Sequence, residues 1–265
     1  MPSPDATHPS PRQVALVTGG GVRIGRAIAC ALAGAGYDVA IHLRRPPTGE
    51  TQAQADALLA EVAACGGRGA LVHAELADAS AVAGLLPAAE AALGPVTLLV
   101  NNASEFHDDG IGHLDAAVWD RQFAVNLRAP VFLAEALAAR LTEGANAAVV
   151  NIIDQRVLKP TPRFLSYSLA KSGLWAATRL LAQALAPRVR VNAVAPGPTM
   201  RSARQSEEDF AAQNAAMPLG RGASPEEVAD AVLFLARATS VTGQMIAVDG
   251  GQHIGWQTPD TFVIE

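Results

Sequence analysis

Tyr167 and Lys171 are four residues apart, and an aspartate, Asp154, precedes the tyrosine by thirteen positions. On a helix, residues at this spacing share a face, so the lysine ammonium can lie under the tyrosine phenol. A positive charge about 4 Å from the phenol is worth roughly 4 kcal/mol at an effective dielectric constant of about 20, enough to lower a phenol pKa of about 10 by about 2 or 3. The trio therefore predicts an acid catalyst working near neutral pH. The alternative is a surface tyrosine and lysine on an amphipathic helix.

The N-terminal part of the chain predicts a turn that binds a dinucleotide. An apolar run at 14–17 leads into Thr18-Gly-Gly-Gly21, and residues 24–33 then have the pattern of a helix. Glycines at such a turn let backbone amides approach a pyrophosphate, which the helix N-terminus holds with its free N–H groups and its positive dipole end.

The next predicted strand carries a signal about the cofactor. It runs from Tyr37 to Leu43 and ends in Arg44 and Arg45, where an acidic residue is expected if the ribose has a free 2′-hydroxyl. Arginine suits a 2′-phosphate, and Arg23 in the glycine turn could add a second guanidinium in bidentate geometry. We therefore expect NADPH/NADP+ as the cofactor, unless the two arginines after the strand are only a solvated pair in a loop.

Length and element order predict one α/β domain. The chain has 265 residues, of which 50% are hydrophobic. Strands that alternate with helices predict a single-domain, Rossmann-type doubly wound parallel sheet at 12–265. The segment 1–11 is rich in proline and serine, lacks the apolar core of a signal peptide, and is expected to be a disordered tail.

Charge and cysteine usage limit the partners. The net charge is −5 and the basic residues are spread along the chain, which argues against nucleic acid, and no run is long enough to span a bilayer. Cys30 and Cys65 lack a metal or redox spacing, and the six histidines form no ligand cluster. We therefore expect a cytoplasmic protein with reduced thiols and no metal, whose partner is a small molecule.

The remaining elements predict where a ligand lies. Further strands are expected at 69–73, 96–100, 147–153, 189–193 and 245–248, and further helices at 49–65, 78–92, 116–141, around 167–171 and at 225–236, with a polar segment before 222. In doubly wound sheets, ligands lie outside the carboxyl ends of the strands. Because Gly19, Asn102, Asp154 and Pro196 all stand at such ends, one crevice is expected to hold them.

Together the motifs resemble the short-chain dehydrogenase/reductase family over roughly Arg12 to Gly255. They are Thr18-Gly-Gly-Gly-Val-Arg-Ile-Gly25, Asn101-Asn-Ala-Ser104, Asn126, Tyr167 with Lys171, Pro196-Gly197 and Val248-Asp-Gly-Gly251. The resemblance implies that Tyr167 is the catalytic acid, that Lys171 binds the nicotinamide ribose and lowers the tyrosine pKa, and that Asn126 helps to hold a proton-relay water. It also implies a homo-oligomer, either a tetramer or a dimer.

The same resemblance implies a set of cofactor-binding residues. Besides the tyrosine and the lysine, they are Gly19, Arg23, Ile24, Gly25, Arg44, Glu75, Asn102, Ala103, Pro196, Gly197 and Thr199. Glu75 stands where the family usually has an aspartate that contacts the adenine amine. Either the longer acid makes this contact or the contact is lost.

Three departures from the common family pattern coincide with the pteridine reductase branch. Arg23 replaces a glycine of the turn, Ser104 replaces the last glycine of N-N-A-G, and Asp154 replaces a serine. Phe106 matches an aromatic residue of that branch. The resemblance implies that a pterin ring stacks between Phe106 and the nicotinamide, that Ser104 touches the ring, and that Arg23 contacts both a cofactor phosphate and the substrate.

The chemistry of Asp154 independently favours the same interpretation. A serine hydroxyl donates a hydrogen bond to a carbonyl oxygen that becomes an alkoxide, whereas an ionised carboxylate repels that oxygen. When the acceptor is a C=N bond, hydride goes to carbon and the nitrogen needs a proton, which a carboxyl group beside the tyrosine can supply or relay. The open alternatives are that Asp154 only caps a turn and that Phe106 only packs.

The sequence thus predicts an NADPH-dependent reductase of a dihydropteridine or related pterin C=N bond. The first alternative is a carbonyl or 3-oxoacyl thioester reductase, against which stand Asp154 and a loop at 199–222 without an obvious basic face for a carrier protein. The second alternative is a non-catalytic regulator that binds NADP(H). Such proteins usually lose the tyrosine or the lysine, and this chain keeps Tyr167 and Lys171.

Overall fold

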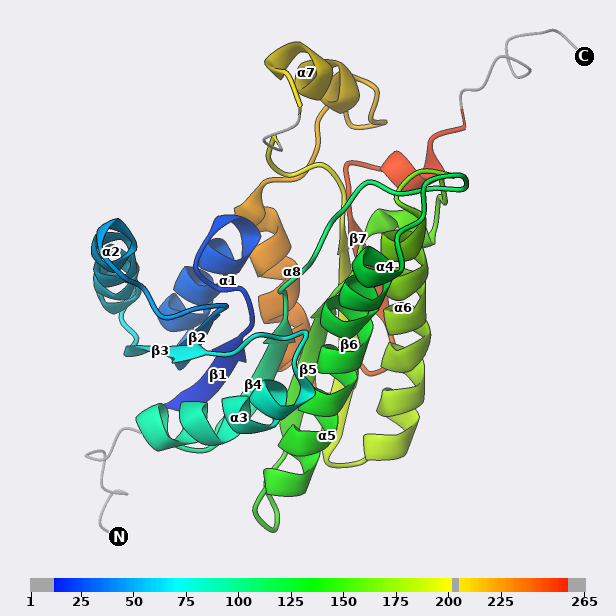
Figure 1. Cartoon of the computed structure of the whole chain (residues 1–265). Coiled ribbons are helices and arrows are strands. Elements are labelled where there is room, and N and C mark those ends of the chain that lie inside the picture. The colour runs from blue at the N-terminus through cyan, green and yellow to red at the C-terminus, as the bar shows by residue number, and fades with distance from the viewer. Residues whose placement is uncertain (1–11, 202–204, 257–265) are drawn as a thin grey trace, which may run out of the picture.

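The computed structural model describes residues 12–201 and 205–256. In these ranges seven parallel strands form one sheet in the order β3-β2-β1-β4-β5-β6-β7 (Figure 1), which is the expected doubly wound arrangement. The strands are β1 Gln13–Val17, β2 Tyr37–Leu43, β3 Gly69–His73, β4 Val96–Asn101, β5 Ala147–Ile152, β6 Val189–Pro196 and β7 Met245–Val248. The tail expected at 1–11 lies outside the described residues.

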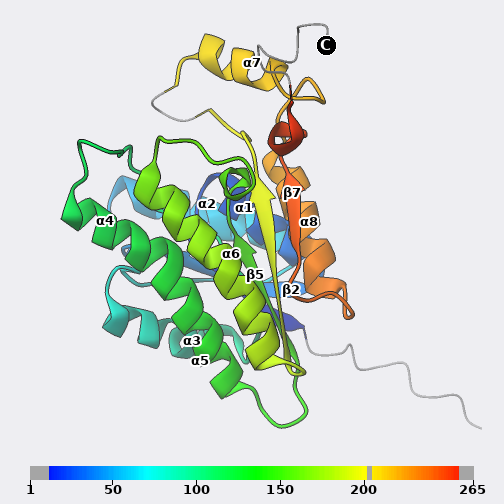
Figure 2. The same cartoon turned by 90° about the vertical axis from the view of Figure 1, so that its right-hand side faces the viewer.

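Helices cover both faces of the sheet. They are α1 Arg23–Gly34, α2 Glu50–Ala64, α3 Ala79–Leu93, α4 Ala116–Phe123, α5 Ala129–Arg140, α6 Leu165–Leu185, α7 Glu207–Ala215 and α8 Pro225–Arg237. The layer of α1, α2 and α8 and the layer of α3, α5 and α6 lie on opposite sides of the strands (Figures 1 and 2). No helix within the described ranges combines the length and the apolarity that crossing a membrane requires.

Strand alternation divides the core into two clusters. Ala15 and Val17 of β1 pack with the layer of α1, α2 and α8, whereas Val14 and Leu16 pack with the layer of α3, α5 and α6. Successive side chains of a strand point to opposite faces, and a sheet covered on both faces needs apolar residues on both. This requirement explains why the inner strands are continuous apolar runs that were predicted from the sequence alone.

The structure differs from the expected elements in two places. The helix expected at 116–141 is interrupted by one π-helical turn, Ala124–Arg128, which carries Asn126. Such turns occur frequently at functional sites. The segment expected to be a polar loop contains α7, whose N-cap, Ser206, accepts a hydrogen bond from the backbone N–H of Asp209. Helix α7 lies beyond the carboxyl ends of the strands (Figure 2).

Candidate active site

Tyr167 and Asp154 meet at the carboxyl end of β5. The Tyr167 hydroxyl donates a 2.9 Å hydrogen bond to Oδ2 of Asp154. The other carboxylate oxygen, Oδ1, accepts from the backbone N–H of Arg156 at 2.8 Å, so Asp154 also caps the short 3-10 helix Gln155–Val157. The two interpretations of Asp154, a turn cap and a partner of the tyrosine, are therefore both met by one side chain.

Lys171 is buried behind the tyrosine ring. Its Nζ donates to the carbonyl oxygen of Ile152 at 2.8 Å and lies 5.7 Å from the centroid of the Tyr167 ring. Burial lowers the pKa of Lys171 to about 8, and the charge of Asp154 opposes this decrease. Lys171 thus lies near the ring, while its hydrogen bond goes to the β5 backbone.

The expected lowering of the tyrosine pKa is wrong for this structure. Burial raises the pKa of Tyr167 well above its ordinary value, and the charge and hydrogen bond of Asp154 raise it further. The main reason is burial of the phenol, and in addition the carboxylate contacts the phenol oxygen directly, whereas the lysine contacts a backbone carbonyl. The phenol is therefore held in its protonated form, which is the form that a proton donor needs.

Asn126 fixes the turn after β4. Its Oδ1 accepts from the Ser104 hydroxyl at 2.9 Å and from the Glu105 N–H at 3.1 Å, and its Nδ2 donates to the Glu105 carbonyl at 2.8 Å. The side chain of Asn126 thereby holds the peptide between Ser104 and Phe106. The proton-relay water that the family resemblance implies at this residue stays a prediction.

Phe106 belongs to an aromatic cluster beside the tyrosine. Its ring stacks on Phe164 with centroids 4.4 Å apart and meets Tyr167 edge-on at 4.7 Å. The guanidinium of Arg156 lies 5.6 Å from the Phe106 ring and 5.2 Å from the Phe164 ring, and its Nη1 also pairs with Asp154 at 3.1 Å. Phe106 is thus a packing residue that also lines the cavity in front of Tyr167.

The sequence interpretation missed Arg156 and Phe164. Arg156 follows Asp154 by two positions, close enough for an ion pair, which was the available signal. Phe164 has a backbone φ of 57°, a left-handed conformation that is uncommon for a residue other than glycine and that clusters at functional sites.

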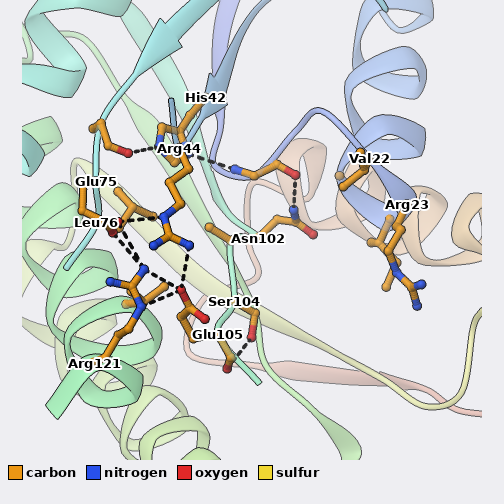
Figure 3. Close-up of a pocket in the computed structure, with 16 residues that line it drawn as sticks. Val22, Arg23, His42, Arg44, Glu75, Leu76, Asn102, Ser104, Glu105 and Arg121 are labelled. Carbon is orange, nitrogen blue, oxygen red and sulfur yellow. Dashed lines mark hydrogen bonds and ion pairs between the residues drawn. The ribbon is translucent and has the colours of Figure 1, made fainter. Parts of the chain in front are cut away.

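Two cavities lie at the carboxyl edge of the sheet. The first, of about 450 Å³, is at the switch point between β1 and β4, where strand order reverses (Figure 3). Eight of the predicted cofactor residues line it, of which Arg23 is also a predicted substrate residue, together with the predicted substrate residue Ser104: Gly19, Arg23, Ile24, Gly25, Arg44, Glu75, Asn102, Ala103 and Ser104. The described residues show no group of three or more His, Cys, Asp or Glu that could hold a metal ion.

The second cavity, of about 590 Å³, lies in front of the tyrosine and beneath α7. Predicted residues that line it are Arg23, Phe106, Asp154, Tyr167 and Gly197. Four predicted site residues in the described part of the chain line neither of these two cavities: Asn126, Lys171, Pro196 and Thr199. Arg23 lines both cavities, so it stands where the two meet.

The glycine turn is held close to β4. A Cβ at Gly25 would lie 2.2 Å from the carbonyl oxygen of Gly19, so only glycine fits there. The amide of Asn102 donates to the carbonyls of Thr18 and Gly19 at 2.9 and 3.0 Å. His42 accepts from the Gly19 N–H through Nδ1 and contacts the Ala74 carbonyl through Nε2, and burial lowers its pKa. His42 is therefore a neutral structural residue.

Arg23 lines both cavities, as expected, but does not face Arg44. It replaces the family glycine while keeping a positive φ of 53°, and its guanidinium donates to the carbonyls of Met200 and Arg201 at 3.1 Å. Figure 3 places it across the cavity from Arg44. The expectation that Arg23 and Arg44 clasp one 2′-phosphate is therefore not met, because the two guanidiniums point to opposite ends of the cavity.

Arg44 belongs to a network of four charged side chains. Its Nε donates to Glu75 at 2.7 Å and its Nη1 lies 3.6 Å from Glu105 (Figure 3). Arg121 pairs with the same two carboxylates, at 3.2 Å and 2.6 Å. Glu75, expected at the adenine, is thus engaged by arginines. The sequence interpretation missed Glu105, which directly follows Ser104 in the turn after β4. It also missed Arg121, which α4 brings to this cavity only in the folded chain.

Comparisons with known proteins identify the family and the fold. A family model described as enoyl-(acyl carrier protein) reductase matches residues 21–253. The crystal structure of FolM alternative dihydrofolate reductase 1 from Brucella suis, in complex with NADP, is 50% identical, has a TM-score of 0.88, and shares 94% of this chain and 98% of that one. The protein of the same name from Brucella canis, also complexed with NADP, is 48% identical with a TM-score of 0.86, over 95% of this chain and 98% of that one.

A curated relative gives the same family from sequence alone. The 3-oxoacyl-[acyl-carrier-protein] reductase of a Synechocystis species is 34% identical over 245 residues, which cover 90% of this chain and 96% of the relative. These matches extend over nearly the whole chain, and the range 21–253 of the family model contains Tyr167 and Lys171. The chain therefore belongs to the short-chain dehydrogenase/reductase family.

Proposed function

We propose that the protein is an NADPH-dependent reductase that acts on the C=N bond of a dihydropteridine or a related pterin. The observation that carries the proposal is the 2.9 Å hydrogen bond between Tyr167 and Asp154. A carboxylate at this position opposes a developing alkoxide, whereas it can accept from a ring N–H or relay a proton to a ring nitrogen. The Brucella reductases, at 48% and 50% identity, support the same substrate class.

The residues of the first cavity fit a dinucleotide phosphate. The glycine turn leaves no room for a Cβ at Gly25, and the N-cap of α1, Val22, makes no side-chain cap hydrogen bond. The first N–H groups of α1 therefore keep their capacity to bind a pyrophosphate, which the helix dipole also favours. Arg44 supplies a guanidinium for a 2′-phosphate. These features support NADPH over NADH.

Each reacting residue has a defined part in the proposed reaction. Bound NADPH supplies the hydride, which the substrate accepts at the carbon of its C=N bond. The buried Tyr167 hydroxyl remains protonated and donates a proton toward the ring nitrogen, directly or through Asp154. Lys171 keeps its position through its bond to the β5 backbone and would bind the nicotinamide ribose, as the family resemblance implies. Phe106 presents an aromatic wall for a flat substrate ring.

The proposal is tested by NADPH oxidation with a panel of dihydrobiopterin, dihydromonapterin, dihydrofolate and simple ketones. We expect turnover with at least one reduced pterin. Tyr167→Phe removes the phenolic proton and should lower kcat by about 10²- to 10⁴-fold, while NADPH binding is retained. Wild-type protein that reduces ketones well and no pterin would overturn the pterin assignment. A Tyr167→Phe variant with normal turnover would assign the proton to another group.

One comparison favours a second candidate, reduction of a carbonyl or 3-oxoacyl thioester. The Synechocystis relative carries the name 3-oxoacyl-[acyl-carrier-protein] reductase. Asp154 argues against this activity. Its carboxylate is hydrogen-bonded to the Tyr167 phenol, so it would lie close to the alkoxide that forms when a ketone is reduced beside that phenol. The ketone arm of the panel, extended to a 3-oxoacyl thioester, separates the two candidates.

A further inference from the structure

Three buried polar side chains link α6 to the segment before α4, outside the reacting residues. They are Asp109, Gln122 and Ser166, with exposed fractions of 3%, 0% and 0%. The backbone N–H of Ser166 donates to Oδ1 of Asp109 at 3.1 Å, and the Ser166 hydroxyl donates to Oδ2 of Asp109. Gln122 donates from Nε2 to the Ser166 hydroxyl oxygen. Buried polar groups that satisfy one another in this way define a single local geometry.

The residue that directly precedes α6 does not cap the helix. The residue before it, Phe164, has a left-handed backbone and makes no side-chain cap hydrogen bond. The first N–H groups of a helix have no partner within the helix, and here Asp109 takes two of them. Its backbone carbonyl accepts from Leu165 at 3.3 Å and its carboxylate accepts from Ser166. A carboxylate at this position is also stabilised by the positive end of the helix dipole.

The same network fixes the segment that carries Phe106. Asp109 lies three residues after Phe106, and Oε1 of Gln122 accepts from the backbone N–H of His107 at 3.2 Å. At the other end, Ser166 directly precedes Tyr167, whose ring meets Phe106 at 4.7 Å. The two walls of the second cavity are therefore joined through one buried carboxylate.

We propose that Asp109 is a positioning residue, a remote N-cap that holds the start of α6 and thereby places the Tyr167 hydroxyl on Asp154 and opposite Phe106. The inference rests on the proposed role of Tyr167 as proton donor. It does not depend on which substrate receives the proton.

The first test compares Asp109→Ala with a matched cap, Asp115→Ala. Asp115 caps α4 by accepting from the N–H of Val118 at 2.9 Å, and it is exposed. If Asp109 positions the tyrosine, Asp109→Ala lowers kcat by about 10- to 100-fold, a loss in the range that small misplacements of reacting groups produce. NADPH affinity should change by less than about twofold, because the network does not line the first cavity. Asp115→Ala should keep the wild-type kcat.

Asp109→Asn covers the case in which the alanine variant does not fold. Asparagine caps helices about as well as aspartate and keeps an acceptor for the Ser166 N–H, but it presents N–H groups to the hydroxyl. We expect a kcat between the wild-type and alanine values. A folded Asp109→Asn enzyme with wild-type kcat, when the alanine variant is unfolded, would overturn the proposal.

A second measurement does not need activity. The chain contains two tyrosines, so in a Tyr37→Phe background the phenolate absorbance reports Tyr167 alone. With Asp109 present, burial and Asp154 raise the pKa of Tyr167, so the phenolate absorbance should appear only above the pH range in which an ordinary tyrosine titrates. Asp109→Ala should let the phenol titrate nearer its ordinary pKa of about 10.

The two failures are distinguishable. Wild-type protein without pterin reduction would remove the proposed substrate, while the tyrosine titration would still test Asp109. A folded Asp109→Ala variant with an unchanged titration and a kcat equal to that of Asp115→Ala would leave Asp109 as an ordinary helix cap.

Discussion

Replacing Arg44 with alanine tests how the proposed cofactor is selected. Arg44 directly follows β2, lines the first cavity, and has a side chain that is 52% exposed. A charge-assisted hydrogen bond to a phosphate is worth about 1.5 to 3 kcal/mol. Arg44 must first give up its pair with Glu75, and a pair this exposed is worth about 0 to 1 kcal/mol. The midpoints of these two ranges differ by about 1.7 kcal/mol, which leaves roughly 1 to 2 kcal/mol for the 2′-phosphate.

This energy corresponds to a loss of roughly 5- to 30-fold in kcat/KM for NADPH in Arg44→Ala. The kcat/KM for NADH should stay level or rise, since NADH has no 2′-phosphate. Steady-state kinetics with both cofactors measure the ratio, which we expect to favour NADPH by at least about tenfold in wild-type protein, about 1.4 kcal/mol.

Arg45→Ala is the matched control, because it removes the same charge from the next residue, which is exposed and does not line the first cavity. It should change the ratio by less than about twofold, in line with the small effect of screened surface charges. Equal efficiency of wild-type protein with both cofactors would refute the reasoning. So would an Arg45→Ala variant that loses as much NADPH preference as Arg44→Ala.

Two further predictions concern the reacting residues. Asp154→Ser should lower pterin turnover and leave ketone reduction unchanged or improved, because the serine hydroxyl donates a hydrogen bond to an alkoxide. Parallel assays with a pterin and a ketone measure both activities. An equal loss of both would leave Asp154 as a turn cap. Burial lowers the pKa of Lys171 from 10.5 to about 8. Between these pH values the unfolded state binds more protons than the folded state, so the free energy of unfolding rises with pH. Below pH about 8 the cost of burying the charged lysine is present in full. Urea unfolding at pH 7 and 9.5 should therefore show the wild-type protein gaining stability relative to Lys171→Met, and a constant difference would contradict this assignment.

The sequence predicted the strands best and one helix not at all. The bounds of β2, β3 and β7 agree with the prediction because strands in a covered sheet are short apolar runs between turn residues. Helix α7 was missed because it has no buried residue and hence no apolar stripe. Its signal was Ser206 followed by three acidic residues, which is the pattern of an N-cap with a negatively charged first turn.

For the site, the sequence determined which reacting groups are present and the fold determined their state. Spacing alone placed Tyr167 and Lys171 on one helix face, and the structure joins Asp154 to the tyrosine as expected. The direction of the tyrosine pKa was decided by burial and by which atom each charge contacts, and neither is encoded by spacing. Arg121 and Asp109 act on residues far away in the chain, so their partners exist only after folding brings α4, α6 and the turn after β4 together.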